Sequence, residues 1–308
     1  DPETCHKTAI NLLAIASVCP ISKAVLRTLW GKRRKPLELT AFGQKLSSPI
    51  GLAAGFDKNI QGARALSQLG FGFLELGAAT NLPGSGNARP RAFRLATDNA
   101  LVNRMGLPNI GAAAIAQRLS KLKTSVPFGI NIAGTKGLPK EANSIQDFVD
   151  CYKLVSPFVS FTVINISCPN TATGRTFEDP KLCDELLDAI SEVRAPNVPL
   201  LIKFSNDLAD EDLISLISVC ESHLVDGYVI SNTSSKREGL SSPEGLIQKI
   251  GAGGLSGMPI KQKAVHLVSV AAKLTTKPIV GVGGIFGAKD AIDFFAAGAS
   301  LVQIYTGL

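Results

Sequence analysis

Short, continuous apolar runs recur along this chain from residue 50 onward, with helix-like stretches between them. The runs cover residues 50–53, 73–76, 128–132, 161–164, 200–203, 227–230, 279–282 and 301–304. Continuous apolar runs, unlike alternating ones, are typical of parallel strands that are buried on both faces. Amphipathic stretches at 109–123, 179–193 and 210–223 have the spacing of helices. Eight strands alternating with helices predict an α/β fold, a (β/α)8 TIM barrel.

The 308 residues, of which 45% are hydrophobic and 19% charged, suffice for one large core. We expect two parts: an N-terminal helical extension at residues 1–36 and a barrel at 37–308. The sequence stops just after the eighth predicted strand, so we expect the eighth helix of the barrel to be missing. No apolar run reaches the length of about 18 residues that a membrane-spanning helix needs. The polar start at Asp1 does not resemble a secretory signal.

Two short helices are predicted in the extension. Asp1 is suited to cap the first, Pro20 to end it, and Ser22 to cap the second. The second helix places Val25, Leu26, Leu29 and Trp30 on one face, and a basic run at 32–35 follows it. Such helices either lie in a membrane interface or pack on the main domain, and the sequence favours neither.

Composition excludes several classes of function. The six cysteines form no C-x-x-C pair and the three histidines lie far apart, so we predict no metal site and a reducing compartment. The net charge of +7 is concentrated partly in the basic run, which is a solvated face, an anionic-membrane contact or a nucleic-acid contact. Aromatic residues make up only 6%, so we expect no nucleic-acid binding.

Polar residues follow most of the predicted strands. In a barrel they share the rim where the carboxyl ends of the strands meet, which is where barrel enzymes place their chemistry. These residues are Gly55, Lys58, Asn165, Cys168, Lys203, Asn232, Thr233, Gly283, Gly284, Tyr305 and Thr306. The sequence therefore predicts an active site at this rim.

The segment 165–171 is the most informative of these loops. It places the thiol of Cys168 between the carboxamides of Asn165 and Asn170, directly after an apolar strand. A thiol can accept a proton, and the amides can hold a planar polar substrate. The alternative is an ordinary strand exit with a buried free cysteine.

Glycine clusters follow the predicted seventh strand at 281–284 and occur again at 253–257. Bare backbone N–H groups at these places favour a phosphate site, although each cluster alone is more often a tight turn. No G-x-G-x-x-G opens a βαβ unit, so a Rossmann nicotinamide site is not indicated. Lys203 either reaches solvent or neutralises a cofactor's negative charge. For Lys58 the simple alternative is an ion pair with Asp57.

Several motifs together resemble the dihydroorotate dehydrogenase family across nearly the whole chain. They are Ala53 to Asn59, Asn103 to Leu107, Asn165 to Thr171, Gly253 to Gly257, Gly281 to Gly284 and Tyr305-Thr306. The resemblance implies an FMN-dependent (β/α)8 barrel that oxidises dihydroorotate to orotate in pyrimidine biosynthesis.

The resemblance also assigns roles to matching positions. Cys168 stands at the position of the catalytic base, and Lys203 would stabilise charge on the reduced flavin. The substrate would be held by Lys58, Asn103, Met105, Gly106, Leu107, Asn165, Asn170, Asn232 and Thr233. FMN would contact Ala53, Ala54, Gly77, Asn131, Asn165, Lys203, Ser231, Ser256, Gly257, Gly283, Gly284, Tyr305 and Thr306.

The motifs point to two classes within the family. The segment 53–58, the N-terminal helices and Asn103-Arg104 resemble the membrane-associated class that reduces quinone, whereas Cys168 and the segment 105–109 resemble the soluble class. We favour quinone as electron acceptor, with the helices forming its access path and a peripheral membrane location. That location is the cytoplasmic side of a membrane or, in a eukaryote, the inner mitochondrial membrane. The alternatives are fumarate or another soluble acceptor with a cytosolic location, a related FMN enzyme for another ring, and an inactive flavin-binding relative.

Overall fold

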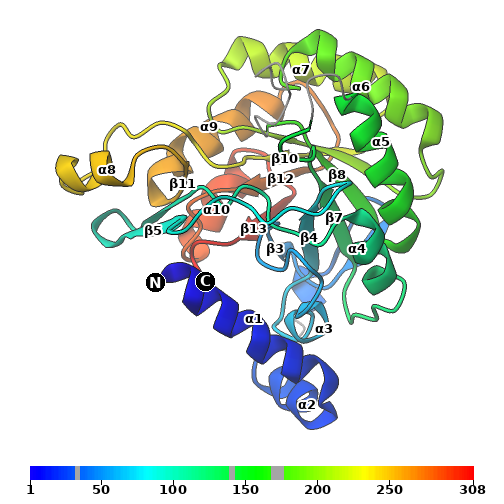
Figure 1. Ribbon diagram of the computed structural model, residues 1–308. Coiled ribbons are helices and arrows are strands. Elements are labelled where there is room, and N and C mark those ends of the chain that lie inside the picture. The colour runs from blue at the N-terminus through cyan, green and yellow to red at the C-terminus, as the bar shows by residue number, and fades with distance from the viewer. Residues whose placement is uncertain (32–34, 139–142, 168–176) are drawn as a thin grey trace.

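The structure is a computed structural model that describes residues 1–31, 35–138, 143–167 and 177–308 (Figure 1). Eight parallel strands close into a barrel in the order of the chain, with the last strand pairing with the first. They are β3 (Ile50–Leu52), β4 (Phe73–Ala79), β7 (Phe128–Ile132), β8 (Phe161–Asn165), β9 (Leu200–Phe204), β10 (Gly227–Ile230), β12 (Ile279–Val282) and β13 (Leu301–Ile304). All eight predicted strands are confirmed.

Helices surround the barrel in the described part of the chain (Figure 1). They are α3 (Ala63–Leu66), α4 (Ala112–Leu119), α5 (Ser144–Val155), α6 (Pro180–Val193), α7 (Asp210–Ser222), α9 (Lys261–Ala271) and α10 (Ala288–Ala296), whereas α8 (Glu244–Ile250) lies apart from the barrel at the left of Figure 1. Short 3₁₀ turns are η1 (Lys35–Leu37), η2 (Ala96–Asp98), η3 (Ser156–Phe158) and η4 (Met258–Ile260). The predicted helix at 109–123 is shorter than expected because Gly111, with φ of +81°, precedes its first turn. As predicted, no helix follows β13 before Leu308.

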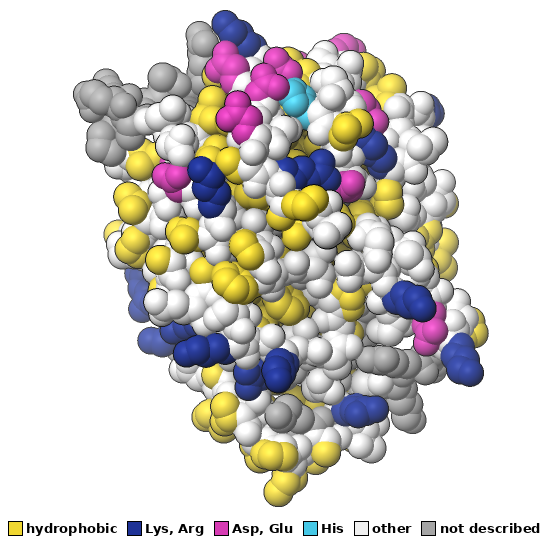
Figure 2. All heavy atoms as spheres, turned by 90° about the vertical axis from the view of Figure 1, so that its right-hand side faces the viewer, with side chains coloured by type: hydrophobic (Ala, Val, Ile, Leu, Met, Phe, Trp, Pro, Cys, Tyr) yellow, Lys and Arg dark blue, Asp and Glu magenta, His cyan; other side chains and the backbone are white. Residues whose placement is uncertain are grey.

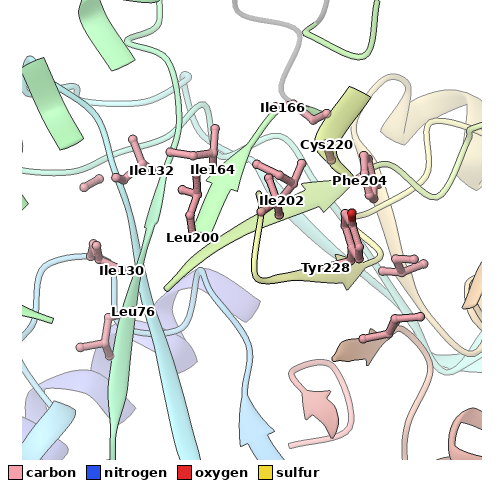
Figure 3. Close-up of a cluster of buried hydrophobic side chains, with 14 of the residues drawn as sticks. Leu76, Ile130, Ile132, Ile164, Ile166, Leu200, Ile202, Phe204, Cys220 and Tyr228 are labelled. Atoms are coloured by element: carbon pink, nitrogen blue, oxygen red, sulfur yellow. The ribbon is translucent and has the colours of Figure 1, made fainter. Parts of the chain in front are cut away.

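Apolar side chains pack on both sides of the barrel wall. Outside it, Leu76, Ile130, Ile164, Ile202 and their neighbours fill the space beneath the helices (Figure 3). Inside it, a separate cluster forms the floor, where the Phe73 and Phe161 rings lie 6.2 Å apart. The hairpin of β1 (Leu39–Ala41) and β2 (Gln44–Leu46) contributes to this floor. The lower interior is therefore full, and only the upper end of the barrel is left for polar groups.

A three-stranded antiparallel sheet lies outside the barrel, and the sequence patterns did not predict it. It pairs β5 (Ala92–Leu95), β6 (Ala100–Asn103) and β11 (Gly254–Gly257), with β6 in the centre. The pairing brings together two predicted site segments that lie about half the chain apart, because Asn103 is opposite Gly254.

The N-terminal extension forms α1 (Pro2–Val18) and α2 (Pro20–Leu29), which meet at 104°. The Asp1 cap is confirmed, because its carboxylate accepts the Thr4 backbone N–H at 3.1 Å. The predicted Ser22 cap is wrong. Pro20 already occupies the first turn of α2, so Cys19 is at the N-cap position and Ser22 lies within the helix.

One face of α1 packs against the barrel while the rest of the extension exposes apolar side chains. Ser17 Oγ accepts the Ala65 N–H at 3.1 Å, and the Glu3 carboxylate pairs with Arg91 at 2.8 Å. The exposed apolar residues are Leu12, Ile15, Val18, Ile21, Val25, Leu29 and Trp30. Figure 2 shows hydrophobic side chains at the lower tip of the molecule, with Lys and Arg side chains just above them. Among the described helices none alone is long and apolar enough to cross a membrane, and only the bent pair α1 and α2 together reaches that length.

Candidate active site

The carboxyl ends of β8 and β10 are joined by a chain of polar side chains. Asn232 Nδ2 donates to Ser167 Oγ at 2.7 Å and to Asn165 Oδ1 at 3.4 Å, and Ser167 Oγ donates to the same Asn165 oxygen at 2.7 Å. The Thr233 backbone N–H donates to Asn232 Oδ1 at 2.8 Å, which fixes the loop after β10. The structure thus brings together three predicted substrate residues and adds Ser167.

Asn103 reaches the same region from the outer sheet. Its Nδ2 donates to the Gly254 carbonyl at 3.3 Å. Thr233 lies against Gly254, because a Cβ at Gly254 would come within 2.2 Å of Thr233 Oγ1. Asn103 and Thr233 therefore flank one backbone segment. Cys168 and Asn170, the predicted base and one predicted substrate ligand, lie outside the described residues.

A buried polar layer lies inside the barrel. The Glu75 carboxylate accepts hydrogen bonds from Asn131 Nδ2 at 2.7 Å, Gln303 Nε2 at 2.7 Å and Lys203 Nζ at 3.3 Å. None of the four residues is more than 5% exposed. Lys203 is therefore paired inside the barrel, and the alternative that it reaches solvent is wrong.

This layer offers unsatisfied acceptors. Asn131 Oδ1 and Gln303 Oε1 are buried and have no hydrogen-bond partner among the residues described. Buried polar atoms are nearly always paired, so two orphaned carbonyl oxygens in one buried layer indicate a site for a donor. A flavin ring carries such an N–H donor, and the Lys203 ammonium suits the charge that the ring gains on reduction. These residues fit the expected cofactor.

The predicted phosphate end is built from backbone and hydroxyl groups. Thr306 Oγ1 donates to Ser256 Oγ at 2.9 Å, which links the end of β13 to β11. Gly284 has φ of +66°, and a Cβ there would lie 2.9 Å from the Gly257 carbonyl and 2.6 Å from Lys261 Cβ. Only glycine allows so close an approach of these loops. The residues around Gly257, Gly283 and Gly284 thus converge, as a phosphate cradle requires.

The remaining predicted cofactor residues line the same rim. Ala53 donates its N–H to the Ile304 carbonyl at 3.1 Å, and the Gly55 N–H donates to the Gly77 carbonyl at 2.7 Å. The Tyr305 hydroxyl donates to the Gly55 carbonyl at 3.2 Å. The predicted contact Ala54 follows Ala53 in this loop, and Ser231 follows β10 and is buried.

Lys58 lies in the loop after β3, and its ammonium contacts the Gly55 carbonyl. Burial lowers the pKa of Lys58 to about 8, and the Asp57 carboxylate opposes this effect. Asp57 was the alternative partner for Lys58, but the two side chains form no ion pair among the described residues. The Asp57 carboxylate instead accepts the backbone N–H groups of Gln61 and Gly62, each at 2.8 Å, and so stabilises the turn before α3.

A cavity of about 240 Å³ separates α1 from this loop. It is lined by α1 residues including His6 and Ile10, and by Lys58, Arg91 and Met105 on the barrel side. His6 Nε2 donates to the Phe56 carbonyl at 2.7 Å. Burial, together with the nearby charge of Lys58, lowers the pKa of His6. The cavity therefore joins the N-terminal helix to two predicted substrate residues, Lys58 and Met105.

Sequence reasoning missed Glu75, Gln303, Ser167, His6 and Arg91. A signal existed for the first two, because each is a strongly polar residue within an otherwise apolar strand. Such a residue is costly to bury unless it has a partner or a ligand.

Comparison with known proteins gives a consistent result. The family model described as dihydroorotate dehydrogenase matches residues 36–308. A dihydroorotate dehydrogenase (quinone) of Chloroflexus aurantiacus is 39% identical over 320 residues, covering 100% of this chain and 87% of that protein. One of Mycobacterium tuberculosis is 39% identical over 313 residues, covering 99% and 85%.

Solved structures show the same similarity. The DHODH of Eimeria tenella in complex with ferulenol has a TM-score of 0.86 at 30% identity, covering 100% of this chain and 86% of that one. The ligand-free form has a TM-score of 0.87 at 31% identity, covering 100% and 90%.

Proposed function

The chain belongs to the dihydroorotate dehydrogenase family, and we propose that it oxidises dihydroorotate to orotate with FMN and passes the electrons to a quinone. Family membership implies a flavin. The observation that supports this most strongly is the buried layer of Glu75, Asn131, Lys203 and Gln303, which offers orphaned acceptors and a cation below the polar rim.

The substrate is a planar ring that carries amide groups and a carboxylate. In our proposal Lys58 binds the carboxylate, because it is a partly buried ammonium beside the rim. Asn103, Asn165, Asn170 and Asn232, with Thr233, bind the polar ring edge, since carboxamides pair with ring N–H and C=O groups. Main-chain groups of Met105, Gly106 and Leu107 close one side.

Cys168 is proposed to remove the proton at C5 of dihydroorotate. The thiolate form of Cys168 would accept this proton and become the thiol, and the ordinary cysteine pKa of about 8.5 makes it a suitable base near neutral pH. Bound FMN supplies the hydride acceptor for C6. Lys203 stabilises the negative charge that then develops beside it, as preorganised cations do in low-dielectric sites. The flavin would be held by the buried layer, the glycine loops of Gly257 and Gly284, and Thr306.

Substitution of Cys168 tests the proposed removal of the C5 proton. We expect Cys168→Ala to slow flavin reduction by dihydroorotate about a hundredfold or more, the usual contribution of a general base. Anaerobic stopped-flow absorbance measures this rate, with orotate affinity as the control for an intact site. Flavin reduction at the rate of the unmodified protein would contradict the role of Cys168.

The N-terminal helices support the proposal that the electron acceptor is a quinone. In our proposal the quinone reaches the rim through the cavity between α1 and the loop of Lys58, which Ile10 of α1 lines together with Lys58 and Met105. The relatives from Chloroflexus aurantiacus and Mycobacterium tuberculosis carry the name dihydroorotate dehydrogenase (quinone). We therefore place the enzyme at a membrane surface, with the exposed residues of α1 and α2 in the interface.

Removal of residues 1–35 distinguishes a quinone that is reached through the N-terminal helices from a soluble electron acceptor. We expect the truncated protein to lose turnover with a water-soluble quinone analogue while dihydroorotate still reduces its flavin. Fumarate and NAD, offered in place of quinone, serve as the competing acceptors. Undiminished quinone turnover after truncation would contradict the access path.

A further inference from the structure

The charge state of Glu75 determines how its neighbours are oriented. An ionised carboxylate accepts hydrogen bonds but donates none, so each group that faces it must turn a donor toward it. Asn131 and Gln303 therefore both present their NH2 groups to Glu75. Their carbonyl oxygens are consequently directed elsewhere, and both are among the three buried side-chain atoms without a partner in the described residues, the third being Arg237 Nε.

The Glu75 carboxylate also contributes negative charge to the buried polar layer. Lys203 Nζ lies 3.3 Å from Glu75 Oε1, and both side chains are almost fully buried. At this depth the two charges interact strongly, because little water screens them. The Glu75 carboxylate thus offsets part of the positive charge that Lys203 presents to anything bound above it.

We propose that Glu75 is a positioning residue of the flavin site and that Gln303 is a flavin-binding residue, an inference that rests on the proposed cofactor. The oxidised isoalloxazine ring has a single N–H donor, at N3. Glu75 fixes the carbonyl oxygens of Asn131 and Gln303 as the acceptors for this donor. Through Lys203 it also limits how far the reduced, negatively charged ring is stabilised.

Replacement of Glu75 by glutamine reverses part of this arrangement. The new amide can donate to one neighbour, which then turns its carbonyl toward position 75 and is lost as an acceptor for the ring. The same substitution removes the negative charge beside Lys203. Glu75→Asp keeps both the charge and the acceptor-only character, and it is the conservative control.

The test compares two ligands that differ only at N3. Apoprotein is titrated with FMN and with 3-methyl-FMN, whose N3 carries no hydrogen, and binding is followed by flavin fluorescence. We expect the unmodified protein to prefer FMN by about tenfold, the effect of one buried acceptor left unpaired. Glu75→Gln should reduce that preference several-fold, and Glu75→Asp should retain it. If Glu75→Gln does not fold, Gln303→Met removes one acceptor directly and should reduce the preference in the same way.

The reduction potential of the bound flavin provides a second readout. Loss of the Glu75 charge should shift the potential to more positive values, because Lys203 then stabilises the reduced ring more strongly. A purely structural role predicts that both flavins bind more weakly by the same factor, with no shift in potential, and this result overturns the inference. These titrations contain no dihydroorotate. If the protein binds FMN and 3-methyl-FMN equally well, only this inference is overturned. A chain that binds neither flavin overturns the proposed cofactor as well.

Discussion

Glu178 is a carboxyl group that the fold holds at an unfavourable pKa, and its replacement should stabilise the protein in a pH-dependent way. Burial raises the pKa of Glu178 to about 7, although its carboxylate accepts the Ser205 N–H at 2.6 Å. The nearby carboxylates of Asp207 and Asp212 raise this pKa further. The ionised form is therefore disfavoured in the folded chain.

The sign of the effect follows from proton binding. Because the folded pKa is above the ordinary value of 4.5, the folded state binds more protons than the unfolded state between these two pH values. The free energy of unfolding consequently falls as pH rises through this window, and it levels off above about pH 7. One pKa unit corresponds to about 1.4 kcal/mol, so the full effect is about 3 kcal/mol. Partial exposure of the side chain reduces the expected value to about 2 kcal/mol.

Glu178→Gln removes the ionisable group and retains an acceptor for Ser205. We expect this variant to be about 2 kcal/mol more stable than the unmodified protein at pH 8, or about 4 °C in Tm, and equal to it near pH 4.5. Thermal unfolding at saturating FMN measures the difference at both pH values. Glu185→Gln, at an exposed position on α6, is the matched control and should show no such pH dependence. A Glu178→Gln variant that is less stable than the unmodified protein at pH 8 would show that the fold does not disfavour the ionised Glu178 carboxylate.

Two further predictions concern the site and the N-terminal helix. Because burial lowers the pKa of Lys58 to about 8, orotate binding should weaken about tenfold for each pH unit above that value, and calorimetric titration between pH 7 and 9.5 measures this. Lys58→Met should bind orotate weakly with little pH dependence, whereas an unchanged pH profile in this variant would rule Lys58 out as the carboxylate ligand. Glu3→Gln leaves the buried Arg91 guanidinium without its ion pair, which should weaken the docking of α1 by about 3 kcal/mol. Quinone turnover should then fall while flavin reduction by dihydroorotate is unchanged, and a parallel loss of both rates would contradict the separate role of α1.

The barrel could be predicted because its strands are buried on both faces and are therefore continuously apolar. Helix boundaries were less certain, as the region before α4 shows, where the backbone of Gly111 excludes a helix that the side-chain spacing permits. The sheet of β5, β6 and β11 was not predicted, because its strands have four residues each and β11 has a glycine at each end.

The site was predictable only in part. Residues that follow strands converge by topology, so the grouping of Asn165, Asn232 and Thr233 could be inferred from strand order. The role of Glu75 depends on Asn131, Lys203 and Gln303, which lie on three other strands. A polar residue within an apolar strand is visible in the sequence, but the sequence does not show which such residues pair across the barrel interior. The same holds for Arg91, whose partner Glu3 is on the N-terminal helix.

The proposed reaction has two halves: dihydroorotate reduces a flavin in this barrel, and a quinone reoxidises it. The most direct measurement is anaerobic stopped-flow absorbance of the FMN-loaded protein, mixed first with dihydroorotate and then with a quinone analogue or with fumarate. We predict that dihydroorotate bleaches the flavin and that the quinone analogue, but not fumarate, restores its colour. A flavin that dihydroorotate does not bleach would contradict the proposed reaction, and restoration by fumarate alone would contradict the proposed acceptor.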